Sequence, residues 1–166
     1  MKKIIFAILF LMTALITNAQ ITKVEIMATG LTCSMCSNAI NKQLKTIAEV
    51  EKVDIDLNKN IFLVTLKTEN KLTPKTFRDK VEKAGFFIGS MILSVNFANQ
   101  HVEDNKQIDQ YIFIDTKAQT LNGLAKVKVL DKGYVTAKEY KKLAKTFVKY
   151  QTYARDNEGV FHLKAI

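Results

Sequence analysis

The spacing of apolar residues predicts a strand followed by a helix in the first part of the chain. Between 21 and 28, apolar residues occupy alternate positions, with Val24 and Ile26 on one face. Such alternation is typical of a strand with one buried face. Gly30 ends this strand. From about 34 to 48 the apolar residues recur every three or four positions, which predicts an amphipathic helix.

Both patterns then recur up to residue 97. Alternation predicts three further strands, at 53–57, 61–67 and 91–97. Thr73 and Pro74 are the predicted N-cap and first residue of a second helix, and Gly85 its end. The order β-α-β-β-α-β predicts an α+β chain with a ferredoxin-like fold, in which both helices lie on one face of an antiparallel sheet.

The rest of the chain is predicted as a separate unit. The polar stretch 99–110 is interpreted as a linker between a first domain at 20–98 and a small β-rich α+β domain at 111–166. A partial barrel is one arrangement considered for the second domain. Its predicted elements are strands at 111–114 and 125–130 with a turn at 121–123, a helix within 135–150 capped by Thr136, and closing strands at 151–155 and 160–166.

Residues 1–19 are typical of a secretory signal peptide. A basic start precedes an apolar run at 4–16, and small residues lead to a cleavage point after Ala19. The competing interpretation is a membrane anchor, but the run of 13 residues is shorter than the roughly 20 that a spanning helix needs. We therefore expect an exported protein, periplasmic or secreted, with no membrane span after cleavage.

Composition and charge narrow the class of partner. The chain is 48% hydrophobic with one Pro and six Gly, which is compatible with a packed core and not with disorder. Its net charge of +9 is spread along the sequence without a basic block. Nucleic acid is therefore not expected as a partner.

Cys33 and Cys36, the two cysteines of the chain, are the candidate functional residues. Two thiols three positions apart at a strand-to-helix junction can hold one soft metal ion or cycle through a disulfide. A purely structural disulfide would close a very short loop and contribute little stability. No constellation of catalytic residues is predicted elsewhere, so the chain is not expected to be an enzyme.

The chemistry of two sulfur ligands favours Cu(I) or Hg(II), which accept two-coordinate geometry, whereas structural Zn(II) takes four ligands. The N-terminus of a helix stabilises the thiolate that binds the metal. His101 and His162 lie outside this part of the chain and are predicted to be surface residues.

The segment Gly30-Leu31-Thr32-Cys33-Ser34-Met35-Cys36, together with the order of elements, resembles the heavy-metal-associated domain family. That family includes copper chaperones, modules of copper-exporting P-type ATPases and the periplasmic mercury-binding protein. The resemblance implies that Cys33 and Cys36 are both metal ligands. It also implies that Leu31, in place of the family's Met, is an apolar support beneath the loop, and that Phe86 shields the site. Met35 is predicted to face solvent.

The sequence therefore predicts an exported soluble metallochaperone that carries, buffers or transfers Cu(I), or less favourably Hg(II) or another thiophilic ion, by thiolate exchange. The expected partners are the metal ion and a protein that exchanges it, with the chain a monomer or a metal-bridged dimer. One alternative is a dithiol redox protein using the same pair, although the single proline, Pro74, is placed as a helix start and not as the cis-proline of thioredoxin-like enzymes. The other alternative is an adaptor whose function lies in the C-terminal domain.

Overall fold

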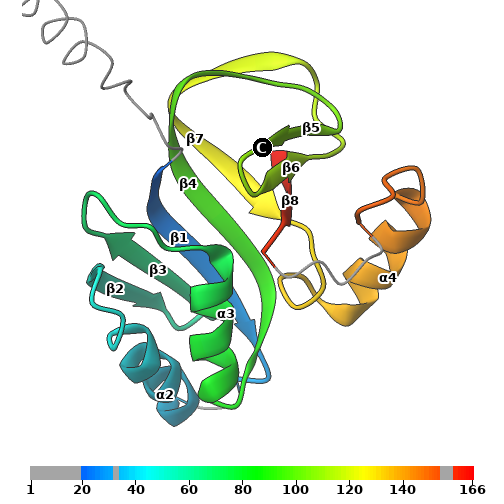
Figure 1. Cartoon of the computed structure of the whole chain (residues 1–166). Helices are drawn as coiled ribbons and strands as arrows, with labels where there is room; N and C mark the ends of the chain where they lie inside the picture. Colours follow the sequence, from blue (N-terminus) through cyan, green and yellow to red (C-terminus); the bar gives the residue numbers. More distant parts are fainter. Residues whose placement is uncertain (1–19, 32–33, 154–158) are drawn as a thin grey trace, which may run out of the picture.

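The computed structural model describes residues 20–31, 34–153 and 159–166. These residues form eight strands and three helices. All eight strands join one sheet, in the order β2-β3-β1-β4-β7-β8-β6-β5 (Figure 1). The second part of the chain therefore extends the sheet of the first part and does not form a sheet of its own.

The first part of the sheet has the predicted ferredoxin-like order. Its elements are β1 (Gln20–Thr29), α2 (Ser34–Leu44), β2 (Val50–Asp56), β3 (Ile61–Leu66), α3 (Pro74–Lys83) and β4 (Phe87–Val102). β1 lies between β3 and β4 and pairs antiparallel with both. Helices α2 and α3 cover the same face of this part of the sheet (Figure 1).

The main core lies between these helices and the sheet. It contains the predicted apolar stripes of the strands and of both helices: Val24, Ile26, Ile40, Leu44, Phe77, Val81, Met91, Leu93 and Val95. The first helix was predicted to reach residue 48, but α2 ends at Leu44. A tight turn follows the helix, in which the N–H of Ile47 bonds to the carbonyl of Leu44 at 3.2 Å. Ile47 is nevertheless buried in the core.

The ends of α3 agree with the prediction. Thr73 is extended and Pro74 follows it, although the Thr73 side chain makes no capping hydrogen bond. At the other end, the N–H of Gly85 bonds to the carbonyl of Glu82 at 2.8 Å, and the N–H of Phe86 to that of Val81 at 3.2 Å. This pair of bonds is a Schellman motif. It directs the chain from α3 into β4.

The segment predicted as a linker, 99–110, is largely sheet. β4 continues to Val102, and β5 (Lys106–Ile108) follows. β4 pairs with β7 (Gln119–Val129) from Met91 opposite Val129 to Val102 opposite Gln119. The polar side chains in this stretch lie largely at the surface, while the backbone is hydrogen-bonded, which is why composition alone indicated a loop.

The turn predicted at 121–123 is also wrong. These residues lie inside β7, where Leu121 pairs with Gln100 and Gly123 with Phe97. The register shifts between those two pairs, and both Asn99 and Gly123 have positive φ, 51° and 72°. This bulge uses the left-handed backbone that a tight hairpin turn also needs, so the sequence indicated the backbone conformation of Gly123 but not its place inside a strand.

The second part adds β6 (Tyr111–Phe113), α4 (Ala137–Thr146) and β8 (Phe161–Ala165). Thr136 caps α4 as predicted, because its hydroxyl accepts a hydrogen bond from the N–H of Glu139 at 3.1 Å. The helix is shorter than the predicted span of 135–150. Of the strand predicted at 151–155, residues 151–153 form a turn and the remainder lies outside the described residues.

Helix α4 covers the face of the sheet opposite to α2 and α3. Alternate residues of β6 show this, because Tyr111 and Phe113 join the main core, whereas Ile112 joins a second cluster beneath α4. That cluster consists of Ile112, Ile114, Leu130, Phe147, Tyr150 and Tyr153. The sheet also curls, since the ring of Phe97 in β4 lies 6.2 Å from that of Phe113 in β6, although two strands lie between β4 and β6 in the sheet.

The second part of the chain also contacts helix α3 directly. The guanidinium of Arg78 lies over the ring of Tyr134, 5.2 Å from its centre. Tyr134 is buried and packs edge-on against Phe161. Within the described residues, no helix has both the length and the apolar character required to cross a membrane.

His162 is buried and not, as predicted, at the surface. It is 1% exposed. Its Nδ1 lies 2.6 Å from Oδ1 of Asp131, and its Nε2 lies 2.9 Å from the hydroxyl of Thr152. Oδ2 of Asp131 accepts the backbone N–H of His162 at 2.6 Å. Asp131 is therefore also a structural residue, which its isolated position in the sequence did not indicate, whereas His101 is exposed as predicted.

We predict that His162→Leu lowers the free energy of unfolding by ~1–3 kcal/mol, because it leaves the Asp131 carboxylate and the Thr152 hydroxyl without this buried partner. Urea denaturation of the full chain measures this change. His101→Leu is the matched control and should alter stability by less than ~0.5 kcal/mol. Equal stability of the two variants would contradict a structural role for His162.

Asp104 joins the turn after β4 to the residues after α4. Its carboxylate accepts hydrogen bonds from the Tyr150 hydroxyl, from Lys149 Nζ at 2.9 Å and from the N–H of Asp115 at 2.7 Å. Burial raises the pKa of Asp104, but the hydrogen bonds from Tyr150 and Lys149 outweigh it and hold the pKa below its ordinary value.

Because the pKa of Asp104 is lowered by folding, its contribution to stability is present above the ordinary value of 3.8 and is lost as pH falls through the folded pKa. We therefore expect Asp104→Asn to be less stable than the wild type near neutral pH, and the difference to shrink under acid conditions. Urea midpoints measured from neutral to strongly acid pH test this. A difference that does not change with pH would show that the charge of Asp104 has no part in it.

Candidate metal centre

The loop that carries the cysteines begins at Gly30. Its φ is +84°, a left-handed conformation in which a side chain would be strained. This residue ends β1 and turns the chain toward α2. Thr32 and Cys33 lie outside the described residues. Cys36 lies in the first turn of α2 and is half-buried.

The position of Cys36 favours the thiolate. The N-terminus of a helix carries partial positive charge, and this lowers the pKa of a thiol placed there. The first turn of α2 contains no acidic residue that would oppose the sulfur's negative charge. The prediction that Cys36 lies at the start of a helix is therefore confirmed, while its role as a metal ligand and the place of Cys33 stay predictions.

Two apolar side chains support the loop from below. Leu31 and Phe86 are half-buried, and both pack against the main core. A Cβ placed on Gly30 would lie 4.0 Å from Cδ1 of Phe86, which shows how close this ring is to the start of the loop. Leu31 thus lies where the sequence predicted an apolar support, and Phe86 lies beside the loop that it was predicted to shield.

Phe87 was not identified from the sequence, although it is 69% exposed beside the same loop. It pairs across the sheet with Thr29, whose hydroxyl donates to the Phe87 carbonyl at 3.3 Å. No pattern in the chain distinguishes it from the half-buried Phe86. Met35, between the two cysteines, is 82% exposed and faces solvent as predicted.

Within residues 20–31, 34–153 and 159–166, no group of three or more His, Cys, Asp and Glu residues lies close enough together to hold a metal ion. His162, with its Asp131 partner, is accounted for by the structural contacts described above. Cys33 and Cys36 accordingly stay the predicted ligands.

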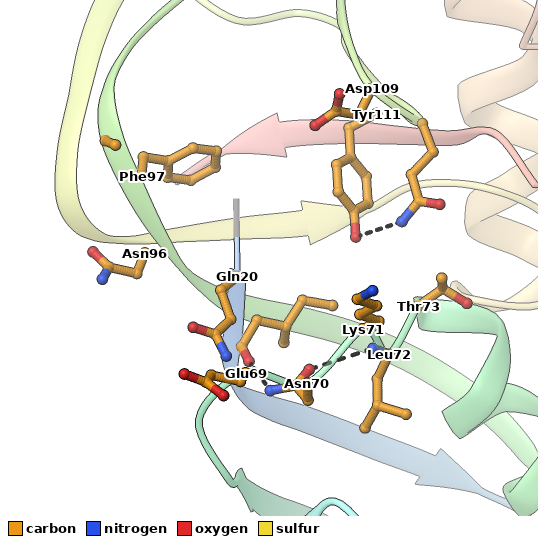
Figure 2. A pocket seen from close by; sticks show the side chains of 13 residues that line it. Gln20, Glu69, Asn70, Lys71, Leu72, Thr73, Asn96, Phe97, Asp109 and Tyr111 are labelled. Carbon is orange, nitrogen blue, oxygen red and sulfur yellow. Dashed lines mark hydrogen bonds between the residues drawn. The ribbon is translucent and has the colours of Figure 1, made fainter. Parts of the chain in front are cut away.

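A cavity of about 740 Å³ lies near the opposite end of β1 (Figure 2). Its lining includes Gln20, Asn70 and Phe97, with Tyr111 and Gln110 on the far side. Figure 2 shows Tyr111 across the cavity from Asn70, and the Gln110 amide donates to the Tyr111 hydroxyl at 3.1 Å. Since Gln20 and Gly30 are at opposite ends of β1, this cavity is separate from the cysteine loop.

Comparison with known proteins agrees with this geometry. Residues 25–87 match the model of the heavy-metal-associated domain. A segment of 57 residues is 40% identical to a copper-transporting ATPase of Saccharomyces cerevisiae and covers 34% of this chain. The match spans only 6% of the length of that ATPase.

Two solved structures are similar to the same part of the chain. One is the yeast copper transporter domain Ccc2a in its apo and Cu(I)-loaded states, at 37% identity, 39% coverage of this chain, 88% coverage of that domain and a TM-score of 0.36. The other is the Atx1–Cu(I)–Ccc2a complex, at the same identity and coverages and a TM-score of 0.35. Since these TM-scores are low, the assignment rests on the family model and the identical residues. Residues 25–87 of this chain are a heavy-metal-associated domain.

Proposed function

We propose that this protein binds one soft metal ion, Cu(I), between Cys33 and Cys36 and passes it to another protein by thiolate exchange. The observation that carries the proposal is the position of Cys36 in the first turn of α2 within a heavy-metal-associated domain. Such domains bind and transfer metal and are not catalysts, so the proposed role is that of a carrier and not of an enzyme. Hg(II) has the same preference for two sulfur ligands and is the competing cargo.

The residues around the loop fit this role. A metal ion bonds to the thiolate form of cysteine, so binding is favoured as pH rises, and the helix N-terminus beside Cys36 favours that form. Leu31 and Phe86 support the loop with apolar groups packed on the core. In transfer, a thiolate of the receiving protein would bond to the ion before one cysteine of this pair leaves, so that the metal is never released to water.

Residues beside Cys36 stay exposed although the second part of the chain is attached. It attaches to the edge of β4 and to α3. Met35, between the two cysteines, and Phe87, beside the start of the loop, remain 82% and 69% exposed. A second protein can therefore approach the sulfur of Cys36 closely enough to exchange a ligand.

We further propose that the protein is exported to the periplasm or secreted, with residues 1–19 removed as a signal peptide. The order of basic, apolar and small residues supports this.

Titration of Cu(I) into the reduced protein, against a competing chelator and without oxygen, tests the metal site. We expect about one Cu(I) per chain, bound tightly, and loss of that binding in Cys33→Ser/Cys36→Ser. Met35→Ser is the matched control, because it changes an exposed residue of the same loop and should leave the affinity unchanged. Binding that survives in the double variant would contradict the proposal.

The intact mass of the protein recovered from the periplasm or medium tests export. We expect a chain that begins at Gln20, while Ala19→Pro, which should block signal-peptide cleavage, leaves the longer chain in the membrane fraction. Recovery of the full chain from the cytoplasm, with residues 1–19 still attached, would contradict export.

A further inference from the structure

The cysteine end of the molecule carries an unusual share of exposed apolar side chains. Seven large apolar residues are exposed in the described part of the chain, and four of them, Met27, Met35, Leu57 and Phe87, are at this end. Figure 1 shows that the end of β1, the start of β4 and the start of α2 lie together there. Leu57 belongs to the turn that reaches the same end, where the carbonyl of Asn60 accepts the N–H of Ala28 at 3.1 Å.

Three of these residues, Met27, Met35 and Phe87, flank the cysteine loop, and we call them the apolar rim. Thr29, one residue before Gly30, lies opposite Phe87, and the hydroxyl of Thr29 holds the Phe87 carbonyl. Met27 lies on the same strand, and Met35 is the residue before Cys36. Met27, Thr29 and Phe87 share the sheet face opposite to the buried Ala28.

The backbone is arranged to leave room for part of this rim. At Gly89, an added Cβ would lie 2.6 Å from Cγ2 of Thr29 and 3.3 Å from Cε of Met27. Any larger residue would displace these two side chains. Gly89 therefore leaves the space that Cε of Met27 and Cγ2 of Thr29 occupy beside β4.

Thiolate exchange determines what must cover this surface. The incoming sulfur has to come within bonding distance of the metal held by Cys36. The protein that carries that sulfur then covers the surface around Cys36, since a stable protein interface buries about 800 Å² on each side. Phe87 and Met35 lie inside such an area and would lose their contact with water.

We infer that the apolar rim is the contact surface for the protein that exchanges metal with this chain, and that Phe87 is its main anchor. The partner is a thiolate-bearing protein with an apolar surface around its own metal-binding sulfurs. This inference rests on the proposed function, because it requires metal exchange at Cys36.

The test uses the full chain loaded with Cu(I), and the apo yeast domain Ccc2a as the acceptor, to which this chain is 37% identical. The rate of Cu(I) transfer is measured for the wild type and for Phe87→Ser, Phe87→Leu and Leu124→Ser. Leu124 is the matched control, since it is 64% exposed but lies opposite Asn96, which pairs with Gln20 at the far end of β1. Chelator competition gives the Cu(I) affinity of each variant.

We expect Phe87→Ser to slow transfer about tenfold, as loss of an aromatic anchor does at protein interfaces. Phe87→Leu should recover most of the rate, and Leu124→Ser should match the wild type. The affinity for Cu(I) in chelator competition should be the same in all four proteins, because Phe87 touches the partner and not the metal.

The possible failures are distinguishable. If the wild type binds no Cu(I) in chelator competition, the proposed function is wrong. If Cu(I) binds but transfer is equally fast in Phe87→Ser, equally slowed in Leu124→Ser, or absent already in the wild type, the apolar rim is not the contact surface. A change in Cu(I) affinity in Phe87→Ser would place this side chain in the metal site and also overturn the inference.

Discussion

The structure depends on the backbone pairing of one long strand with two neighbours. β4 bonds to β1 along the metal-binding half and to β7 over most of its length. In an isolated ferredoxin-like unit with the order β2-β3-β1-β4, this strand would be an open edge, and open edges invite pairing with other chains. Here β7 covers that edge, and the same hydrogen bonds that protect it attach the second half of the molecule.

As a consequence, the cysteine loop and the second half of the molecule are attached to the first half at different places. One end carries the cysteine loop, supported by Leu31 and Phe86 from the main core. The second half lies along β4 and over α3, where Arg78 covers Tyr134. Leu31 and Phe86 thus fix the start of the loop on the core, while Met35 and Phe87 stay exposed to solvent.

The sequence predicted the elements whose apolar periodicity is local, and it missed those that depend on distant partners. The alternation at 21–28 and 91–97 identified two central strands, and Thr136 identified the start of α4. The end of β4 could not be found, because its polar residues pair with a strand some 20 positions later. Gly123 gave a correct signal for left-handed backbone, but only the pairing partner decides between a turn and a bulge.

The candidate site shows the same division. The cysteine motif could be recognised because its residues, Leu31 among them, are contiguous in the sequence. Phe86 could be recognised because it follows the predicted end of a helix at Gly85. The contact between His162 and Asp131 arises only because β8 is inserted between β6 and β7. The exposure of Phe87 follows from its pairing with Thr29. The residues next to Phe87 in the sequence do not indicate this pairing.

β4 runs through both halves of the molecule as one strand, with a register shift after Phe97, and so fixes the orientation of one half relative to the other. The chain passes from the metal end to the second half within one strand, without a hinge between them. Whatever holds the second half would thereby set the direction in which Cys36 faces. The search for a metal donor or acceptor would then be a rotation of the whole molecule, and not the swing of a small domain on a tether.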